Sequence, residues 1–215
     1  MIANLRSSVV SILVMTIFFG FVYAFAGTGV AQLFFKHQAD GSITANGSTL
    51  IGQNWSQASC PGHPLGSCVF QGRPDALGPY AGSAKPVAAG GDNPLEANNI
   101  PGQPSVMNSG ESSATNLGPR SSVLLSNTQA LVAYWKGRGV TPTPDLVSTS
   151  GSGIDPDITP ADAIAQIPMV SAATGISPAR LRTLIASQTH GAQLGFLGSS
   201  YIVVLQLNEA LVALR

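Results

Sequence analysis

A run without a single charged residue, Ser7–Phe35 between Arg6 and Lys36, constrains this chain more than any other feature. The run is rich in Val, Ile, Leu, Phe and Ala, and a helix of this length spans about 43 Å at about 1.5 Å per residue. A bilayer core is only about 30 Å thick, so roughly 20 residues, Val9–Gly29, are enough to cross it. The run therefore predicts a transmembrane helix.

A cleaved secretory signal is the alternative interpretation of this segment. Arg6 supplies a basic start, Val9–Phe19 a short apolar run, and Ala24-Phe25-Ala26 a small-x-small cleavage site. Against cleavage, the uncharged run continues to Leu33-Phe34-Phe35, where a mature chain would already be polar. We expect an uncleaved anchor, with a secreted chain released after Ala26 as the open alternative.

The flanking charges indicate an orientation. The amino terminus and Arg6 precede the segment and Lys36 follows it, which weakly favours a cytoplasmic amino terminus. The predicted domains are then a cytoplasmic head (1–6), a transmembrane helix (7–35) and an extracytoplasmic domain (36–215), in which residues 59–120 are mostly loop.

Small residues recur along the predicted membrane helix. Gly20 and Ala24, and again Gly27 and Ala31, fall four residues apart, a spacing that lets a second helix approach closely. We predict these four residues as a helix-packing stripe. The ordinary glycine and alanine content of a membrane helix explains the pattern equally well.

Charged residues make up only 9% of the chain, with ten Lys plus Arg against ten Asp plus Glu. Typical soluble domains carry about 25%, so this surface is built from Ser, Thr, Asn, Gln and Gly instead. Nucleic-acid binding is excluded, because no cluster of Lys or Arg supplies the basic surface that it needs.

Two cysteines, Cys60 and Cys68, bracket the loop CPGHPLGSC. An even pair that closes a short Pro/Gly loop outside the cytoplasm favours a disulfide. A metal site would need more ligands than two thiols and His63. Two free thiols remain the third option.

Patterns beyond the membrane segment predict mixed helices and strands. Turn signals at Asp40-Gly41 and Asn46-Gly47 indicate hairpin-like structure over residues 36–57, with a strand end at 48–53. The elements predicted after the long loop are a helix at 126–136, a strand at 145–149, helices at 160–174 (N-cap Thr159) and from 178 to near 189, a strand at 201–207, and a terminal helix capped by Asn208. The predicted fold class is α+β: a single N-terminal transmembrane helix followed by one mixed α/β extracytoplasmic domain with long Gly/Pro/Ser-rich loops.

A serine hydrolase is the competing functional hypothesis, with Ser152, Asp155 and His190 as the hydrolytic set. The nucleophile elbow is G-x-S-x-G, however, and Ser150 stands where its first glycine should be. The nucleotide-binding patterns G-x-x-x-x-G-K-[ST] and G-x-G-x-x-G are absent as well. Gly151 and Gly153 match the first two glycines of the second pattern, but Pro156 stands where its third glycine should be. A tight turn, in which the Asp155 carboxylate binds backbone N–H groups, explains the segment better.

The remaining titratable residues give no convincing active site. His37 and His63 lie in polar loop sequence, and His190 is expected to cap a helix end. Asp155 and Asp157 resemble a general acid/base pair, yet they also suit a turn. We predict no catalytic residue and no metal site.

Several of these segments resemble the C subunit of the Kdp-type potassium-transporting P-type ATPase, over nearly the whole chain. The matching segments are Gln38–Ser42, GSTLIGQNW (47–55), FQGRPDA (70–76), TNLGP (115–119), DLVSTSGSGIDPDITPADA (145–163) and THGAQLGFLG to LQLNEAL (189–211). The residues that carry the family motifs are Gly72, Arg73, Pro74, Asn116, Leu117, Gly118, Pro119, Ser150, Gly151, Ser152, Gly153, Asp155 and Pro156.

Some positions depart from the family pattern. Ala24 stands in place of a proline, Asp157 in place of a histidine, and residues 188–192 in place of His-Thr-Glu-Gly-Arg. Segments 59–68 and 85–112 look like insertions. The departures put in doubt a role for the turn at 188–192.

The resemblance implies a non-catalytic accessory subunit of a bacterial plasma (inner) membrane complex for high-affinity potassium uptake. Its implied partners are a potassium-conducting subunit, an ATP-hydrolysing P-type subunit and membrane lipid, and it would stabilise their assembly. The family is also described as a catalytic chaperone that raises the ATP affinity of the hydrolysing subunit in a ternary complex with ATP. That ATP-binding role conflicts with the predicted topology, because a domain outside the cytoplasm does not meet ATP.

Overall fold

The computed structural model describes residues 2–53, 55, 58–74 and 114–215. The chain divides into two compact units, Met1–Ala45 and Asn46–Arg215. The predicted insertion at 85–112 lies outside the described residues.

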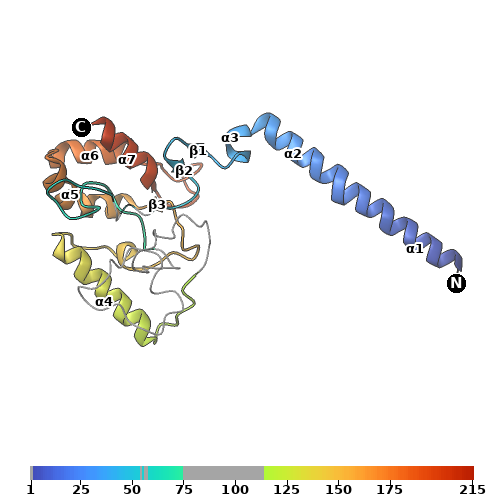
Figure 1. Ribbon diagram of the computed structural model, residues 1–215, viewed down its shortest axis with the longest axis horizontal. Helices are drawn as coiled ribbons and strands as arrows, with labels where there is room; N and C mark the ends of the chain where they lie inside the picture. Colours follow the sequence, from blue (N-terminus) through green and yellow to red (C-terminus); the bar gives the residue numbers. More distant parts are fainter. Residues whose placement is uncertain (1, 54, 56–57, 75–113) are drawn as a thin grey trace. The chain divides into compact units, whose positions relative to one another are not determined.

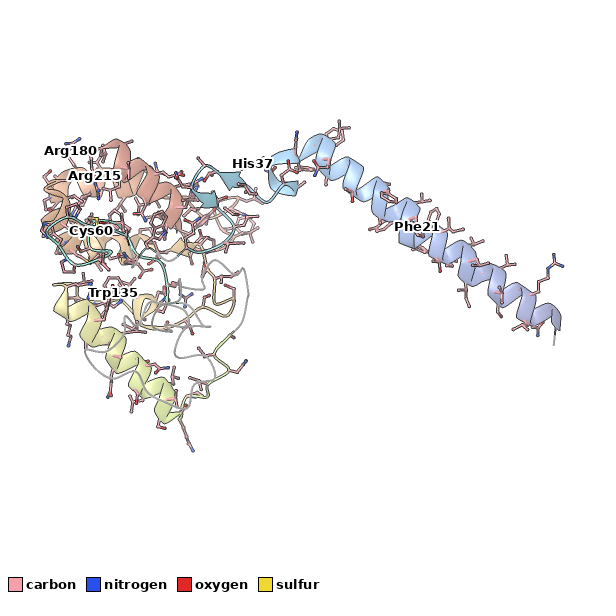
Figure 2. The ribbon with its side chains drawn as sticks, viewed as in Figure 1. Phe21, His37, Cys60, Trp135, Arg180 and Arg215 are labelled. Carbon is pink, nitrogen blue, oxygen red and sulfur yellow. A yellow bond between two sulfur atoms is a disulfide. The ribbon has the colours of Figure 1, made fainter. Side chains whose placement is uncertain are left out.

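The first unit is almost entirely helical (Figure 1). It consists of α1 (Ile2–Met15), a π-helical stretch η1 (Thr16–Val22), α2 (Tyr23–Phe34), the short α3 (Lys36–Ala39) and the two-residue strand β1 (Ile43–Thr44). Residues Asn4–Phe34 form a helix long and apolar enough to cross a membrane, with a mean hydropathy of 2.4. Its large side chains, such as Phe21, point outward along its length (Figure 2). The predicted apolar helix is thus present, as a candidate membrane span.

The second unit contains five of the described helices and three short strands. They are β2 (Gly47–Ser48), α4 (Ser122–Gly137), the 3₁₀ helix η3 (Asp145–Val147), β3 (Asp157–Ile158), α5 (Pro160–Thr174), α6 (Pro178–Ser187), β4 (Ile202–Val203) and α7 (Val204–Ala213). β3 and β4 are antiparallel, with Asp157 opposite Val203 and Ile158 opposite Ile202. This mixture of helices with small sheets agrees with the predicted α+β class.

Helix α5 begins as its sequence predicts. The Thr159 side chain accepts from the Asp162 N–H, and the Asp162 carboxylate accepts from the Thr159 N–H at 2.7 Å, which together form a capping box. The helix ends at Gly175, whose φ of 73° is the left-handed conformation that favours glycine. Pro168 lies inside α5, where a proline is expected to kink or shorten a helix, but the helix continues through it to Thr174.

The core of the second unit lies where α4 and η3 meet α5, α6 and α7. Trp135 of α4 is fully buried, and its indole N–H donates to the Leu146 carbonyl at 2.8 Å (Figure 2). Hydrogen bonding of a buried indole avoids the cost of an unpaired donor. The buried apolar residues around it include Phe70, Leu131, Val170, Leu181, Ile202, Leu207 and Leu211.

Two strand predictions were wrong. Residues 145–149 contain the helix η3, because Pro144 adopts helical angles and its carbonyl accepts from the Val147 N–H at 3.2 Å. In the run 201–207 only Ile202–Val203 is a strand, and α7 begins at Val204. The apolar run is buried almost throughout, and a fully buried segment lacks the periodicity that separates strand from helix.

Three boundary predictions also need correction. Asn208 does not cap a terminal helix, since it is a buried residue inside α7. His190 does not cap α6, which ends at Ser187, and instead pairs with Tyr201. The helix expected at 126–136 starts earlier, at Ser122, because the Ser121 side chain accepts from the Leu124 N–H.

Candidate functional site

The segment before Arg73 is held between two helices by side-chain amides. Asn208 of α7 accepts from the Phe70 N–H at 2.8 Å and donates to the Phe70 carbonyl at 2.9 Å. Gln166 of α5 does the same for Gln71, at 2.8 and 3.0 Å. The two side chains are 1% and 0% exposed. Each amide satisfies both backbone groups of one buried residue, as a neighbouring β-strand would.

The Gln71 side chain extends the same network. Its amide donates to the Gly66 carbonyl at 2.6 Å and to the Trp55 carbonyl at 3.1 Å. Gly66 lies in the loop closed by the Cys60–Cys68 disulfide, whose Cα atoms are 5.6 Å apart. Gln71 therefore ties the disulfide loop to the segment that leads to Arg73.

Arg73 reaches across to the loop that starts at η3. Its guanidinium lies 3.4 Å from the Asp155 carboxylate and 3.8 Å from that of Asp145. It also donates to the carbonyls of Thr149 at 3.2 Å and Ser148 at 3.5 Å. The Arg73 side chain is 22% exposed, so water screens these contacts only in part. One cation thus joins both ends of the segment 145–155.

The segment Ser150–Asp157 is a tight turn built by its own side chains. Ser150 Oγ accepts from the Gly153 N–H at 2.9 Å and lies 3.0 Å from Ser152 Oγ. Asp155 accepts from the Asp157 N–H at 3.1 Å, and Gly153 has a φ of 74°. The predicted turn, with glycine freedom and an aspartate that binds backbone N–H groups, is confirmed.

Gly52 brings a third segment against this turn. Its N–H donates to the Ile154 carbonyl at 2.8 Å. A Cβ added at Gly52 would lie 2.5 Å from the Asp155 carbonyl oxygen, closer than any side chain tolerates. Only glycine allows the two backbones to approach in this way.

The Asp157 carboxyl sits in an environment that disfavours its charge. Burial raises the pKa of the Asp157 carboxyl above its ordinary value, the negative charge of Asp155 raises it further, and His190 opposes both. One Asp157 oxygen, Oδ1, is buried without a hydrogen-bond partner among the described residues. The environment therefore favours the protonated acid.

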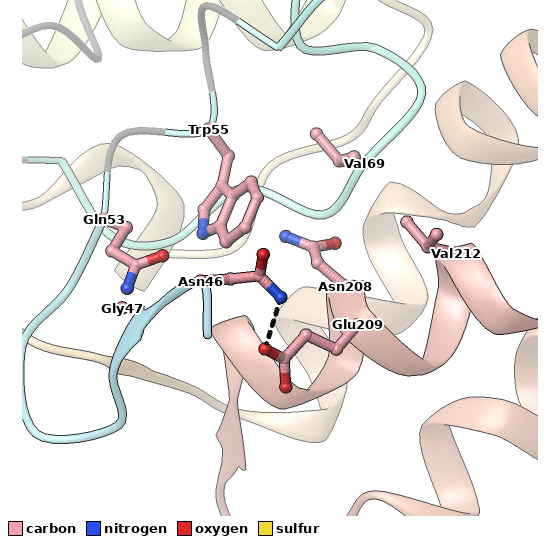
Figure 3. Close-up of a pocket in the computed structure, with 8 residues that line it drawn as sticks. All are labelled: Asn46, Gly47, Gln53, Trp55, Val69, Asn208, Glu209 and Val212. Atoms are coloured by element: carbon pink, nitrogen blue, oxygen red, sulfur yellow. Dashed lines mark hydrogen bonds between the residues drawn. The ribbon is translucent and has the colours of Figure 1, made fainter. Parts of the chain in front are cut away.

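A cavity of about 600 Å³ lies beside α7 (Figure 3). Trp55 and Val69 form one wall and Glu209 of α7 the other, with a hydrogen bond of 2.8 Å from Asn46 to Glu209. Gln53, Gly47, Asn208 and Val212 complete the lining. Within the described residues no group of three His, Cys, Asp or Glu is placed to hold a metal ion.

Comparison with known proteins decides the family. Residues 5–213 match the family model described as KdpC, the c chain of the K⁺-transporting ATPase. The chain belongs to the KdpC family. It is 36% identical to the potassium-transporting ATPase KdpC subunit of Methylorubrum extorquens, over all of this chain and 98% of that protein. The KdpC subunits of Sorangium cellulosum and Rhodopseudomonas palustris are 36% and 37% identical, over 100% and 99% of this chain and 100% and 98% of their own lengths.

The structure of this KdpC chain brings several motif residues together. Arg73 meets Asp155 across the turn that contains Ser150, Gly151, Ser152 and Gly153. Gly72 and buried Pro74 flank Arg73, and the Pro156 carbonyl accepts from the Val204 N–H at 3.0 Å. Asp75 and Ala76, the end of the FQGRPDA motif, lie outside the described residues.

The TNLGP motif forms contacts of its own in this KdpC chain. Asn116 has a φ of 54° and donates to the Ala114 carbonyl at 3.2 Å. The Leu117 N–H lies 3.5 Å from Thr115 Oγ1, and the Gly118 carbonyl accepts from the Ser121 N–H at 2.9 Å. The motif therefore forms a local turn that leads into α4.

The hydrolytic set is not assembled as a triad. The Asp155 carboxylate is engaged by Arg73, and the His190 ring stacks on Tyr201 with centroids 5.0 Å apart. The Ser152 hydroxyl lies against Ser150 and accepts from the Ile154 N–H at 3.3 Å. The geometry gives no support to a KdpC chain that acts as a serine hydrolase.

The sequence patterns miss the buried amides Gln166 and Asn208 as site residues. They assign Asn208 to a helix cap and do not single out Gln166. The one signal available is their position, since each polar side chain falls among apolar residues of a helix. Such a position predicts burial with a hydrogen-bonding partner, but it does not identify Phe70 or Gln71 as that partner.

Proposed function

We propose that this chain is a non-catalytic, single-pass subunit that stabilises assembly of a K⁺-transporting ATPase at the bacterial inner membrane. Its partners are the potassium-conducting subunit and the ATP-hydrolysing P-type subunit. The observation that carries the proposal is the match to KdpC over residues 5–213, which includes both the apolar helix and the second unit.

The second unit lies outside the cytoplasm in this proposal. The amino terminus and Arg6 before the helix, against Lys36 after it, weakly support that orientation. The Cys60–Cys68 disulfide supports it independently, because disulfides persist in oxidising compartments and are rare in the cytosol. The domain then rests on the potassium-entry side of the conducting subunit.

The site supports a structural role for the motif residues. Arg73, Asp155 and the Ser150 turn direct their polar groups to one another and to backbone atoms. A raised ATP affinity of the hydrolysing subunit would have to be transmitted through the membrane helix and the conducting subunit. Direct contact between this domain and ATP is not part of the proposal.

Sidedness of proteolysis tests the topology. Protease added outside intact spheroplasts should remove the second unit and leave a membrane-bound fragment near residues 1–45. The same protease added to inside-out vesicles should leave the unit intact. Cleavage only in inside-out vesicles would reverse the orientation and restore direct contact with ATP as the explanation.

A further inference from the structure

Three large apolar side chains lie close together in the sequence on an exposed turn of the second unit. Leu194, Phe196 and Leu197 are 83%, 75% and 49% exposed, and are called here the apolar turn. Elsewhere in the described part of the second unit, exposed large apolar residues are single, such as Leu125 on α4 and Val212 on α7, apart from the neighbours Leu50 and Ile51. Clustered exposure of this kind marks interaction sites, whereas scattered exposure is ordinary.

The apolar turn is held in one conformation. Gln193 and Leu197 exchange two backbone hydrogen bonds of 2.9 Å, and His190 and Tyr201 exchange two more, at 2.9 and 3.0 Å. The next residue, Ile202 in β4, is fully buried in the core. The turn is thus the tip of a short hairpin rooted in the core, and it loses little conformational entropy on binding.

Leu194 is unfavourable in the isolated unit on two counts. Its φ of 54° is the left-handed conformation, which costs a residue with a Cβ about 1–2 kcal/mol relative to glycine. Its side chain also exposes apolar area that asparagine, which tolerates this conformation, would not. These two features favour a role for Leu194 in a contact with another molecule.

The charges nearby favour a protein partner over a lipid surface. The hairpin from His190 to Tyr201 contains no Asp, Glu, Lys or Arg. Loops that bind bilayers through anionic headgroups carry basic residues next to their apolar tips. An uncharged apolar tip instead matches an apolar pocket in a protein, and KdpC is one subunit of a larger ATPase.

We propose that the apolar turn inserts into an uncharged apolar groove on the extracytoplasmic surface of the potassium-conducting subunit of this ATPase, against which the proposed function places the second unit. This inference rests on the proposed function, because it requires the second unit to face the same side as that groove. Phe196 and Leu194 are the anchors, and the hairpin from His190 to Tyr201 presents them.

Site-specific photocrosslinking in the assembled complex tests the contact. A benzoylphenylalanine is placed at Phe196, and a matched probe at Leu125, which is 60% exposed on α4. The position 196 probe should form an adduct with the potassium-conducting subunit in several-fold higher yield than the position 125 probe. An adduct with lipid, an adduct with a second copy of this chain, or equal yields at the two positions would overturn the proposal.

A substitution separates docking from folding. Leu194→Asn should leave the melting temperature of this chain unchanged or raise it. Together with Phe196→Ser it should lower retention of partner subunits by about tenfold or more, as expected for loss of two apolar anchors. Leu125→Ser is the control and should retain them. Unchanged retention in the double variant would overturn the docking proposal, while the assembly function would still stand.

Discussion

Arg73 is the residue on which the junction of the motif segments depends. It contacts two carboxylates and two carbonyls from the segment 145–155. Arg73→Gln removes the charge, and we expect it to lower the free energy of unfolding by about 1–2 kcal/mol, since the contacts are partly solvent-screened. Urea unfolding of the full chain in detergent measures this. Arg180→Gln on the exposed face of α6 is the control, and an equal loss there would contradict a special role for Arg73.

Asn208 should be far less tolerant of substitution than its helix neighbour Gln206. Asn208→Leu leaves the Phe70 N–H and carbonyl buried without partners, at a cost of about 2–4 kcal/mol in the free energy of unfolding. Gln206→Leu, at a half-buried position of α7, is the matched control. Urea unfolding measures both variants. Similar free energies of unfolding for the two would show that the hydrogen bonds of the Asn208 amide contribute little.

Asp157 gives the chain a pH dependence with a defined sign. Because its pKa is raised in the folded state, the folded chain binds this proton more tightly than the unfolded chain does. The resulting stability is present below the ordinary pKa of 3.8 and is lost as pH rises through the raised folded value. Asp157→Asn should therefore melt higher than wild type at pH 7, with the difference shrinking toward acid. A lower melting temperature for the variant at pH 7 would contradict this sign.

At the scale of elements, two neighbouring glycines of the candidate membrane helix test the predicted packing stripe. A Cβ at Gly27 or at Gly29 meets nothing within 4 Å in this chain, so both positions have room. The two residues lie on roughly opposite faces of α2. If Gly20, Ala24, Gly27 and Ala31 form the packing stripe, Gly27→Leu should reduce copurification of the partner subunits and Gly29→Leu should not. Equal effects would reject the stripe.

Sequence patterns predict elements correctly where local chemistry decides the outcome. Thr159, Asp162 and Gly175 define α5 through contacts within a few residues of each other, so its start and end can be read directly. The start of α7 cannot be predicted in this way, because its residues are largely buried. The pairing of β4 with β3 just before it also depends on residues far apart in the chain.

The candidate site is predictable in part for the same reason. The turn at Ser150–Asp155 is local, and its side-chain hydrogen bonds follow from the residue types. The contacts of Arg73 with Asp155 and of Gln166 with Gln71 join residues separated by 82 and 95 positions. A single sequence carries no information on such pairs unless their chemistry is unique.

At the scale of the whole molecule, we expect the two units of the chain to have different tasks. The apolar helix Asn4–Phe34 is a candidate membrane span, and the motif residues of the second unit contact one another and the backbone. A subunit of this design acts through the surfaces that it presents. Removing the whole chain should therefore affect the assembly of the complex more than the chemistry of ATP hydrolysis.

The most direct measurement of this claim is the composition of the complex purified by a tag on the ATP-hydrolysing subunit, with and without this chain. We predict that without the chain the potassium-conducting subunit is lost from the purified material, and that expression of the wild-type chain restores it together with potassium uptake. An intact pair of partner subunits that purifies equally well without the chain would contradict the assembly role.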